Sequence, residues 1–380
     1  MEAVRQLPYQ VLNWDGSSYA ASLAGSQWNG SSYAASLAGS KGGDDKRSAW
    51  YIVRTGTPLP LICNTMDERL AKILYMNGEF IPAERGVISV RSHGFSYGTG
   101  CFEGIRGYWN EQEQQVYLFR LREHYERLLR SCKILRIELP YSVEDLIEIS
   151  LELVRRNEQK GDVYLRPVAY KGDEVIGVRL NNLTDHFILT SEPMGNYVDL
   201  GGMRCGVSSW RRIDDNAIPA RAKITGSYVN AAFAKTEALQ NGFDEAIMLT
   251  HDGHVSEGSA ENIFLIINGE LVTPSPSENI LLGITRDTVI QLAERELGIK
   301  TRERSIDRTE LYIADEIFLC GTGAQIAPVV SVDHNPVGKG ETGPISKQLQ
   351  DLYFDVVRGK HDFYRDQWCA AAYSKVAQMK

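Results

Sequence analysis

Cysteine is scarce in this chain of 380 residues, and its spacing gives no recognisable cross-link or metal motif. The six cysteines are Cys63, Cys101, Cys132, Cys205, Cys320 and Cys369. None forms a C-x-x-C pair, so neither a disulfide framework nor a zinc knuckle is expected. The pattern favours free thiols in a reducing compartment, and we expect a cytoplasmic protein without a metal site.

Long apolar runs and a strong charge of one sign are absent as well. No segment approaches the roughly 20 apolar residues that a membrane helix requires, and the N-terminus shows no secretory signal. The net charge is -8, from 41 basic and 49 acidic residues. A nucleic-acid binder needs a basic surface to meet phosphates. The sequence therefore favours small molecules over membranes or nucleic acids as binding partners.

Two common catalytic motifs are also missing, namely H-E-x-x-H and G-x-x-x-x-G-K-[ST]. Their absence argues against a zinc protease and a P-loop enzyme. What remains is an ordinary globular composition, with 43% hydrophobic and 24% charged residues.

The chain divides into parts of different composition. In residues 1–71, the segment 14–26 returns almost unchanged as 28–40 and is rich in Ser, Gly and Ala. This predicts a flexible extension without a core of its own. We further expect a smaller N-terminal domain at 72–191, a linker at 192–204, a larger C-terminal domain at 205–365 and a tail at 366–380. Helices and strands do not alternate strictly, which predicts an α+β fold.

Hydrophobic periodicity places the main elements. Asn77-Gly78 lies between two apolar runs and predicts a hairpin turn. Helices are expected at 122–135, 142–157 and 228–241, and from Thr285, as a cap, to Glu296. Strands are expected at 162–170, 186–190, 245–249, 262–267 and 316–319.

Two segments suggest a particular chemistry. In the first, Lys223 is followed five positions later by Tyr228, and the second reads V-S-E-G-S-A-E-N-I-F over 255–264. Alone, Lys223 is one lysine among many. Together the segments resemble the lysine motif and the S-E-G-x-x-x-N-[IL]-F motif of fold-type IV enzymes, which use pyridoxal 5'-phosphate (PLP). The resemblance implies a two-domain fold with PLP at the domain interface.

Four further segments are similar to branched-chain amino-acid aminotransferases. They are Y-G-T-G-C-F-E-G-I-R at 97–106, Y-L-R-P at 164–167, G-I-T-R at 283–286 and C-G-T-G-A at 320–324. The matches keep the family's order from about residue 76 to about residue 354. The resemblance implies transamination of leucine, isoleucine and valine with 2-oxoglutarate.

The resemblance also assigns roles. Lys223 would carry the cofactor and move the α-proton of the substrate, because a lysine amine condenses readily with an aldehyde. The cofactor-binding residues would be Lys223, Glu257, Arg127, Tyr228, Ile284, Thr285 and Thr322. The substrate-binding residues would be Tyr97, Phe102, Gly104, Arg106, Tyr164, Arg166, Val178, Tyr197, Gly323 and Ala324. A homodimer or higher homo-oligomer is expected, in which the partner lends Tyr97 and the segment around Val178.

The chain departs from the family at Met194, at Gln325 and in the segment 173–178, which leaves the substrate range open. Within the same fold, an R-selective amine transaminase, a D-amino-acid aminotransferase and an aminodeoxychorismate lyase remain alternatives. The amine transaminase is the stronger of these, because Met194 and the 173–178 segment would widen the pocket. A protein that binds PLP without catalysis is the alternative from another class, and the presence of Lys223, Glu257 and Arg127 argues against it.

Overall fold

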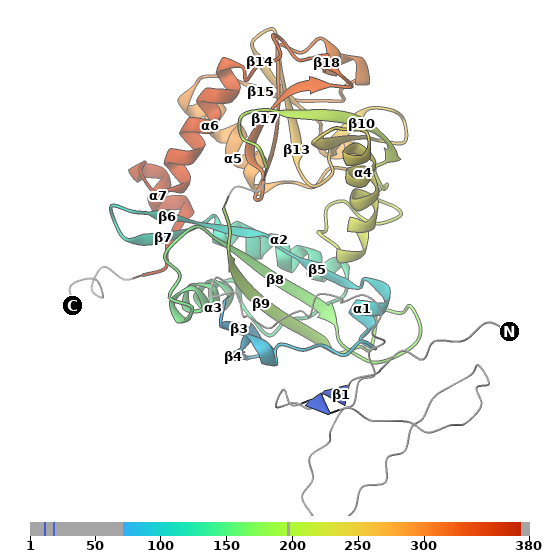
Figure 1. The fold of residues 1–380 in the computed structure, drawn as a ribbon, viewed down its shortest axis with the longest axis vertical. Coiled ribbons are helices and arrows are strands. Elements are labelled where there is room, and N and C mark those ends of the chain that lie inside the picture. Colours follow the sequence, from blue (N-terminus) through green and yellow to red (C-terminus); the bar gives the residue numbers. More distant parts are fainter. Residues whose placement is uncertain (1–10, 13–17, 20–70, 196–197, 374–380) are drawn as a thin grey trace, which may run out of the picture. The chain divides into compact units, whose positions relative to one another are not determined.

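The computed structural model describes residues 11–12, 18–19, 71–195 and 198–373. Contacts within the chain separate residues 1–68 from residues 69–380. In the first unit, β1 (Val11–Leu12) pairs antiparallel with β2 (Ser18–Tyr19). The rest of the repeat and the flexible extension expected at 1–71 lie outside the described residues, except for its last residue. The second unit contains two β-sheets and the helices that pack on them (Figure 1).

The first sheet is antiparallel and, within the described residues, has eight strands. Its order is β19-β7-β6-β8-β9-β3-β4, and β5 also pairs with β8. The strands are β3 (Ile73–Met76), β4 (Glu79–Pro82), β5 (Gly100–Phe102), β6 (Ile105–Asn110), β7 (Gln115–Phe119), β8 (Val163–Lys171), β9 (Asp185–Pro193) and β19 (Cys369–Ala371). The predicted hairpin joins β3 to β4. Asn77 and Gly78 both have positive φ, as a tight two-residue turn requires.

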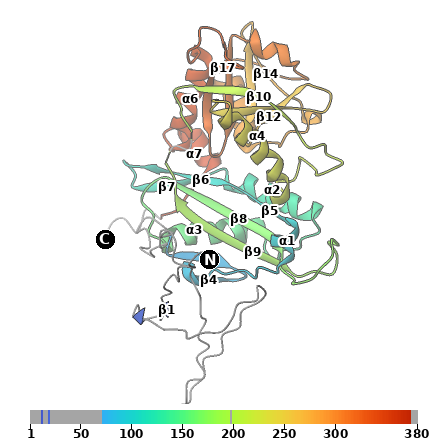
Figure 2. The same ribbon diagram turned by 45° about the vertical axis from the view of Figure 1, so that its right-hand side comes forward.

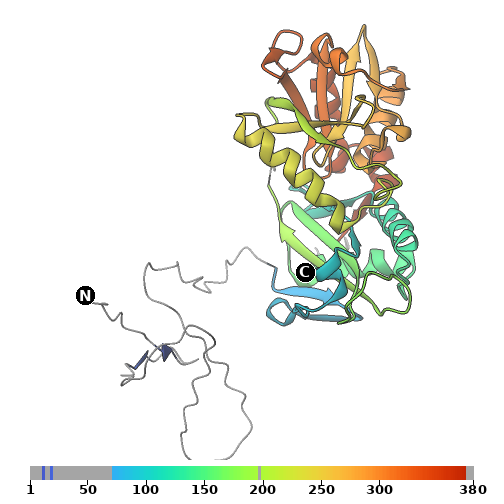
Figure 3. The ribbon, with the colours of Figure 1, turned by 90° about the vertical axis from the view of Figure 1, so that its right-hand side faces the viewer.

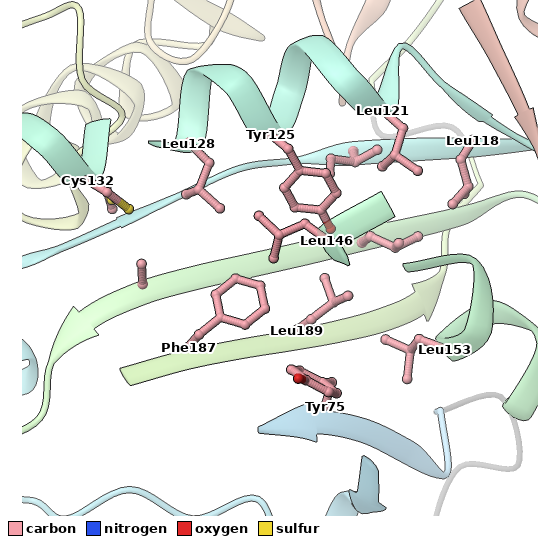
Figure 4. Packing of buried hydrophobic residues seen from close by; sticks show 14 of the residues in the cluster. Tyr75, Leu118, Leu121, Tyr125, Leu128, Cys132, Leu146, Leu153, Phe187 and Leu189 are labelled. Carbon is pink, nitrogen blue, oxygen red and sulfur yellow. The ribbon is translucent and has the colours of Figure 1, made fainter. Parts of the chain in front are cut away.

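Helices α2 (Leu121–Ile134) and α3 (Val143–Arg156) confirm the two helices predicted in this half, and the short α1 (His93–Tyr97) precedes β5. Ser142 and Asp145 form a capping box that starts α3. Figure 4 shows Tyr125 and Leu128 of α2 pointing toward Phe187 and Leu189 of β9. This apolar layer fixes the helix against the sheet, and both helices are also visible in Figure 2.

The second sheet is mixed and has nine strands among the described residues. Its order is β12-β11-β10-β17-β16-β13-β14-β15, with β18 on β17. The strands are β10 (Met203–Arg211), β11 (Glu245–Leu249), β12 (Val255–Gly258), β13 (Asn262–Ile267), β14 (Glu270–Thr273), β15 (Thr301–Glu303), β16 (Glu316–Gly321), β17 (Gln325–Val332) and β18 (Asn335–Pro336). Strand β10 runs parallel to both β11 and β17.

Four α-helices accompany this sheet in the described residues: α4 (Tyr228–Gln240), α5 (Ile284–Glu296), α6 (Pro344–Val357) and α7 (Asp362–Trp368). Helix α4 lies along β10 and β11 (Figure 3), and its buried alanines pack on Met248. Single-turn helices are η1 (Ala83–Arg85), η2 (Thr225–Ser227), η3 (Pro276–Glu278) and η4 (Arg308–Tyr312). The cap predicted for α5 is wrong: Gly283 is the N-cap, and Thr285 lies within the first turn.

The α+β class is confirmed, whereas some expected boundaries fall inside elements. The expected linker at 192–204 overlaps the end of β9 and the start of β10. The expected tail at 366–380 contains the end of α7 and strand β19, whose Cys369 pairs with Phe119 of β7. The residues of β19 are small, which suits a strand at the edge of the sheet. Hydrophobic periodicity alone does not reveal that this segment pairs with β7. No helix in the described part of the chain is long and apolar enough to cross a membrane.

Candidate active site

A cavity of about 590 Å³ is lined by residues from both sheets of the second unit. The first sheet and its helices contribute Phe102, Gly104, Arg127, Tyr164 and Arg166. The second sheet contributes Lys223, Tyr228, Glu257, Ile284, Thr285, Thr322, Gly323 and Ala324, among others. The volume lies within the range of small-molecule sites. The cavity thus brings together thirteen of the sixteen predicted site residues that the structure describes.

The backbone of Lys223 is held by the first sheet. The Lys223 carbonyl accepts a hydrogen bond from the Phe102 amide at 3.0 Å, and its amide donates to the Ser131 hydroxyl at 3.2 Å. The Thr225 hydroxyl donates to the carbonyls of Gly98 and Gly100. The loop that carries Lys223 is therefore anchored on both sides of the lysine, which limits where its amine can reach.

The Lys223 amine points into the cavity beside aromatic rings. Its Nζ donates a hydrogen bond of 2.6 Å to the Tyr228 hydroxyl and lies 5.1 Å from the centre of the Phe102 ring. The five-residue spacing follows from the local structure, because η2 carries the chain from Lys223 directly into α4, which starts at Tyr228. The motif therefore encodes contact between the amine and the hydroxyl.

Glu257 is a buried carboxylate on the same cavity, at the end of β12. It accepts hydrogen bonds from Asn262 Nδ2 at 2.8 Å and from the Leu281 amide at 3.1 Å, and Arg212 Nη2 lies 2.6 Å from Oε1. Burial raises the pKa of Glu257, although Arg212, the Leu281 amide and Lys223 act in the opposite direction. The three donors orient the carboxylate and favour its charged form.

Arg127 of α2 lines the cavity and forms a buried ion pair with Glu103. Its Nε and Nη2 each lie 2.7 Å from a carboxylate oxygen of Glu103, and its Nη1 donates to the Leu282 carbonyl at 2.8 Å. His124 Nδ1 contacts the same carboxylate at 2.8 Å. Burial alone would raise the pKa of Glu103, but Arg127 and His124 lower it well below its ordinary value. The pair therefore stays charged and fixes the guanidinium plane.

Two backbone turns next to Arg127 can receive an anion. Ile284 and Thr285 form the first turn of α5, where backbone N–H groups have no partner within the helix. The β16–β17 turn contributes Thr322, Gly323 and Ala324 to the same cavity. Helix N-termini favour negative charge because the helix dipole adds to these N–H groups. Together with Arg127, they form the part of the cavity best suited to a phosphate.

Another part of the cavity is aromatic and apolar. Tyr164 packs so closely on Gly104 that a Cβ there would collide with the tyrosine hydroxyl. The Arg166 guanidinium carbon lies 4.5 Å from the centre of the Phe102 ring and 5.1 Å from that of Tyr164. An exposed arginine on two aromatic rings suits a carboxylate beside an apolar chain. Val168 and Met194 complete this wall.

Three predicted substrate residues lie elsewhere. Arg106 is buried behind the cavity, with its guanidinium on backbone carbonyls. Tyr97 and Val178 lie at the surface, where the Tyr97 hydroxyl accepts a hydrogen bond from the Gly177 amide at 3.1 Å. Neither lines the cavity within its own chain. Tyr197 lies outside the described residues.

Sequence reasoning missed several residues of this site. Glu103 and Asn262 lie inside quoted motifs, but their contacts with Arg127 and Glu257 were not foreseen. Arg212 has no sequence signal, since it directly follows the arginine that ends β10 and reaches Glu257 only through folding. Glu261 also lines the cavity. Burial, and then the neighbouring Glu245, raise the pKa of Glu261 to about 8.

Comparison with known proteins identifies the family. Residues 100–332 match the model described as Amino-transferase class IV. The chain belongs to the class IV aminotransferases. It is 50% identical over 302 residues to the probable branched-chain-amino-acid aminotransferase of Aquifex aeolicus, a match that covers 79% of this chain and 97% of that protein.

Solved structures of class IV aminotransferases have the same fold. The branched-chain aminotransferase of Thermoproteus uzoniensis with norvaline matches with a TM-score of 0.77 and 42% identity, over 80% of this chain and 100% of that one. The T.th. enzyme with N-(5'-phosphopyridoxyl)-L-glutamate matches with a TM-score of 0.76 and 39% identity, over 80% of this chain and 99% of that one. The PLP-dependent class expected from the motifs is therefore confirmed.

The residues of the cavity fit PLP. The buried Glu257 carboxylate and the Lys223 amine share one cavity with two sets of helix or turn N–H groups. Gly283 leaves room at the start of α5, whereas any larger residue at this position would place its Cβ against the Asn262 side-chain amide. An amine, a carboxylate and an anion-binding turn are the three groups that an aldehyde, a ring nitrogen and a phosphate require.

Proposed function

We propose that the protein transfers an amino group between branched-chain L-amino acids (leucine, isoleucine and valine) and 2-oxoglutarate, with PLP as cofactor. The observation that carries this proposal is the placement of Lys223 and Glu257 on one cavity that is also lined by Phe102, Val168 and Met194. The relatives of known structure include complexes with norvaline and with phosphopyridoxyl-L-glutamate, an apolar and an acidic amino acid.

The chain offers a partner for each part of the cofactor. Lys223 would hold its aldehyde and Glu257 its ring nitrogen. Arg127 and the N–H groups at Ile284, Thr285 and Thr322 would hold its phosphate. When bound, PLP supplies an aldehyde that condenses with amines and a ring that accepts electrons from the substrate. Arg212 supports this arrangement, because its Nη2 lies 2.6 Å from Oε1 of Glu257 and holds the carboxylate in place.

Lys223 is placed to move a proton. Its Nζ donates to the Tyr228 hydroxyl at 2.6 Å, so the tyrosine sets the direction in which the amine points. A lysine amine released from the cofactor can take the proton from the substrate α-carbon and return it. Tyr228 thereby keeps the base at a defined position while the substrate is exchanged.

Arg166 and the aromatic wall account for the choice of substrate. The guanidinium can bind a substrate carboxylate, while Phe102, Val168 and Met194 surround an aliphatic side chain. Each buried CH₂ group contributes about 0.8 kcal/mol, which rewards valine, leucine and isoleucine over alanine. Exclusion of water by this wall also strengthens the ionic contacts of the site.

We also propose that a second copy of the chain completes the site. Tyr97 and Val178 are exposed, as are the apolar residues Val90, Phe95 and Ile176, which lie close to them in the sequence. Large exposed apolar patches mark interaction sites, and a symmetric homodimer is the commonest assembly. A partner seated here would bring Tyr97 and the 176–178 segment to the cavity of the other chain. The cytoplasmic location stays a prediction from the cysteine spacing.

An amino-donor screen tests the proposed reaction. We expect purified protein with PLP and 2-oxoglutarate to convert leucine, isoleucine and valine at least about tenfold faster than D-alanine or (R)-1-phenylethylamine. A faster reaction with the D-amino acid or the amine would contradict the substrate assignment. Bound cofactor without turnover of any donor would contradict catalysis.

A pair of matched substitutions tests the dimer. Ile176→Glu places a charge on the proposed interface, where the side chain is 98% exposed in the single chain. Ile313→Glu makes the same change next to η4, at a side chain that is 74% exposed. Sedimentation should show dissociation for Ile176→Glu only, and the activity assay should show a loss for the same variant only. A fully active monomer would contradict the shared site.

A further inference from the structure

Arg106, on β6 of the first sheet, connects backbone segments that belong to two walls of the cavity. Its Nη2 donates to the carbonyls of Met194 at 3.1 Å and Gly195 at 2.7 Å, and its Nη1 donates to the Gly323 carbonyl at 3.3 Å. Met194 and Gly323 both line the cavity. One comes from the chain that leaves β9, and the other from the β16–β17 turn of the second sheet.

Gln325 completes the contacts of the two terminal nitrogens of this guanidinium. The amide orientation that satisfies both side chains places the Gln325 oxygen 2.6 Å from Nη1 and 3.0 Å from Nη2 of Arg106. Gln325 is buried, and its positive φ of 60° continues the tight turn at Gly323. The terminal nitrogens of Arg106 are therefore already engaged by three backbone carbonyls and one amide.

The surroundings of Arg106 indicate that its contacts fix the position of the guanidinium and do little to neutralise its charge. The nearest carboxylate oxygen, on Asp162, is 3.9 Å away. Asp162 is itself bound by Arg358 at 2.9 Å and by the Trp109 amide at 2.8 Å. A guanidinium presents its donors in a rigid planar fork, which a lysine ammonium cannot reproduce. The fork thus fixes the separation between the carbonyls that it bridges.

We propose that Arg106 is a positioning residue that sets the distance between the Met194 wall and the Gly323 turn, and so the width of the cavity between them. The inference rests on the proposed transamination and specifies what controls its preference among donors. It assigns Arg106 a role different from direct binding of a substrate carboxylate. Loss of these Arg106 hydrogen bonds should favour substrates with side chains larger than that of valine, because the Met194 wall and the Gly323 turn are no longer held at a fixed separation.

Three variants test the role of Arg106. Arg106→Lys keeps the positive charge but removes the planar guanidinium. Gln325→Met removes one hydrogen-bond acceptor and leaves the arginine itself unchanged. Arg358→Lys is the matched control, since Arg358 binds Asp162 and the Trp109 carbonyl and does not line the cavity. The assay measures kcat and KM for valine, leucine and phenylalanine, and KM for 2-oxoglutarate and for 4-methyl-2-oxopentanoate.

The expected result is a change in ratio. The phenylalanine-to-valine ratio of kcat/KM should rise about tenfold in Arg106→Lys, by a smaller factor in Gln325→Met, and by less than about twofold in the control. If Arg106→Lys fails to fold, Gln325→Met decides by the same ratio. An equal loss for all donors would overturn the proposal, as would a KM increase limited to 2-oxoglutarate, which indicates carboxylate binding. Failure of the proposed function would instead appear in the unmodified protein.

Discussion

The buried ion pair between Glu103 and Arg127 gives the most demanding prediction. In Glu103→Gln, the neutral amide presents one oxygen where the carboxylate presents two. One nitrogen of Arg127 then faces an amide NH₂ group, and the positive charge of the arginine loses its partner. Both side chains are almost fully buried, so water cannot replace the lost contacts.

The expected loss of stability follows from that burial. Removing one member of a buried ion pair typically costs about 3–5 kcal/mol, because the other charge is left unpaired. At about 2 °C per kcal/mol for a large chain, the melting temperature should fall by roughly 6–10 °C. The loss should be largest near neutral pH. The folded-state pKa of Glu103 lies below its ordinary value of 4.5, so its stabilisation is lost as pH falls below that value.

Anions should distinguish this site from an ordinary ion pair. In Glu103→Gln the unpaired guanidinium lines a cavity suited to phosphate, so phosphate or PLP should stabilise the variant more than the unmodified protein. Thermal melts of cofactor-free protein in chloride and in phosphate, at equal ionic strength, measure the difference. Glu270→Gln is the control, because Glu270 pairs with Arg302 at 2.8 Å and both side chains of that pair are more than half exposed. It should cost less than about 1 kcal/mol.

Two results would refute the reasoning. One is a loss of stability in Glu103→Gln no larger than that in Glu270→Gln, which would mean that the buried charge is compensated elsewhere. The other is an equal loss in chloride and in phosphate, which would place the unpaired charge out of reach of an anion in the cavity.

Three further predictions concern the cavity itself. Lys223→Ala should abolish transamination and the cofactor absorbance that depends on its amine, while the melting temperature stays within a few degrees; appreciable turnover would reject the assignment. Gly104→Ala should raise KM for leucine by at least about tenfold, because its Cβ displaces Tyr164; unchanged KM would contradict this. Glu261→Gln should become more stable relative to the unmodified protein as pH rises from about 5 to 8. The raised pKa of Glu261, about 8, means that its contribution is lost over that range, and a constant difference in melting temperature would disprove it.

Local elements followed from the sequence wherever one residue pattern determines the structure. The apolar stripes of α2 and α3 each lie on one short segment, so their signals do not depend on the rest of the chain. The Asn77-Gly78 turn needs positive φ at two adjacent positions, which few residue pairs allow. The cap of α5 was misplaced because Gly283 offers no side chain that marks the start of a helix.

The roles expected of Lys223 and Glu257 came from the resemblance of two short segments to a known family, and the spacing within each segment encodes a contact. Lys223 meets Tyr228 across five residues, and Glu257 meets Asn262 across five residues. Tertiary structure alone decided the long-range partners. Glu103 meets Arg127 across 24 residues, and Arg106 meets Gly323 across 217. Such pairs depend on how helices and strands from distant segments pack together, and no local pattern of residues records that packing.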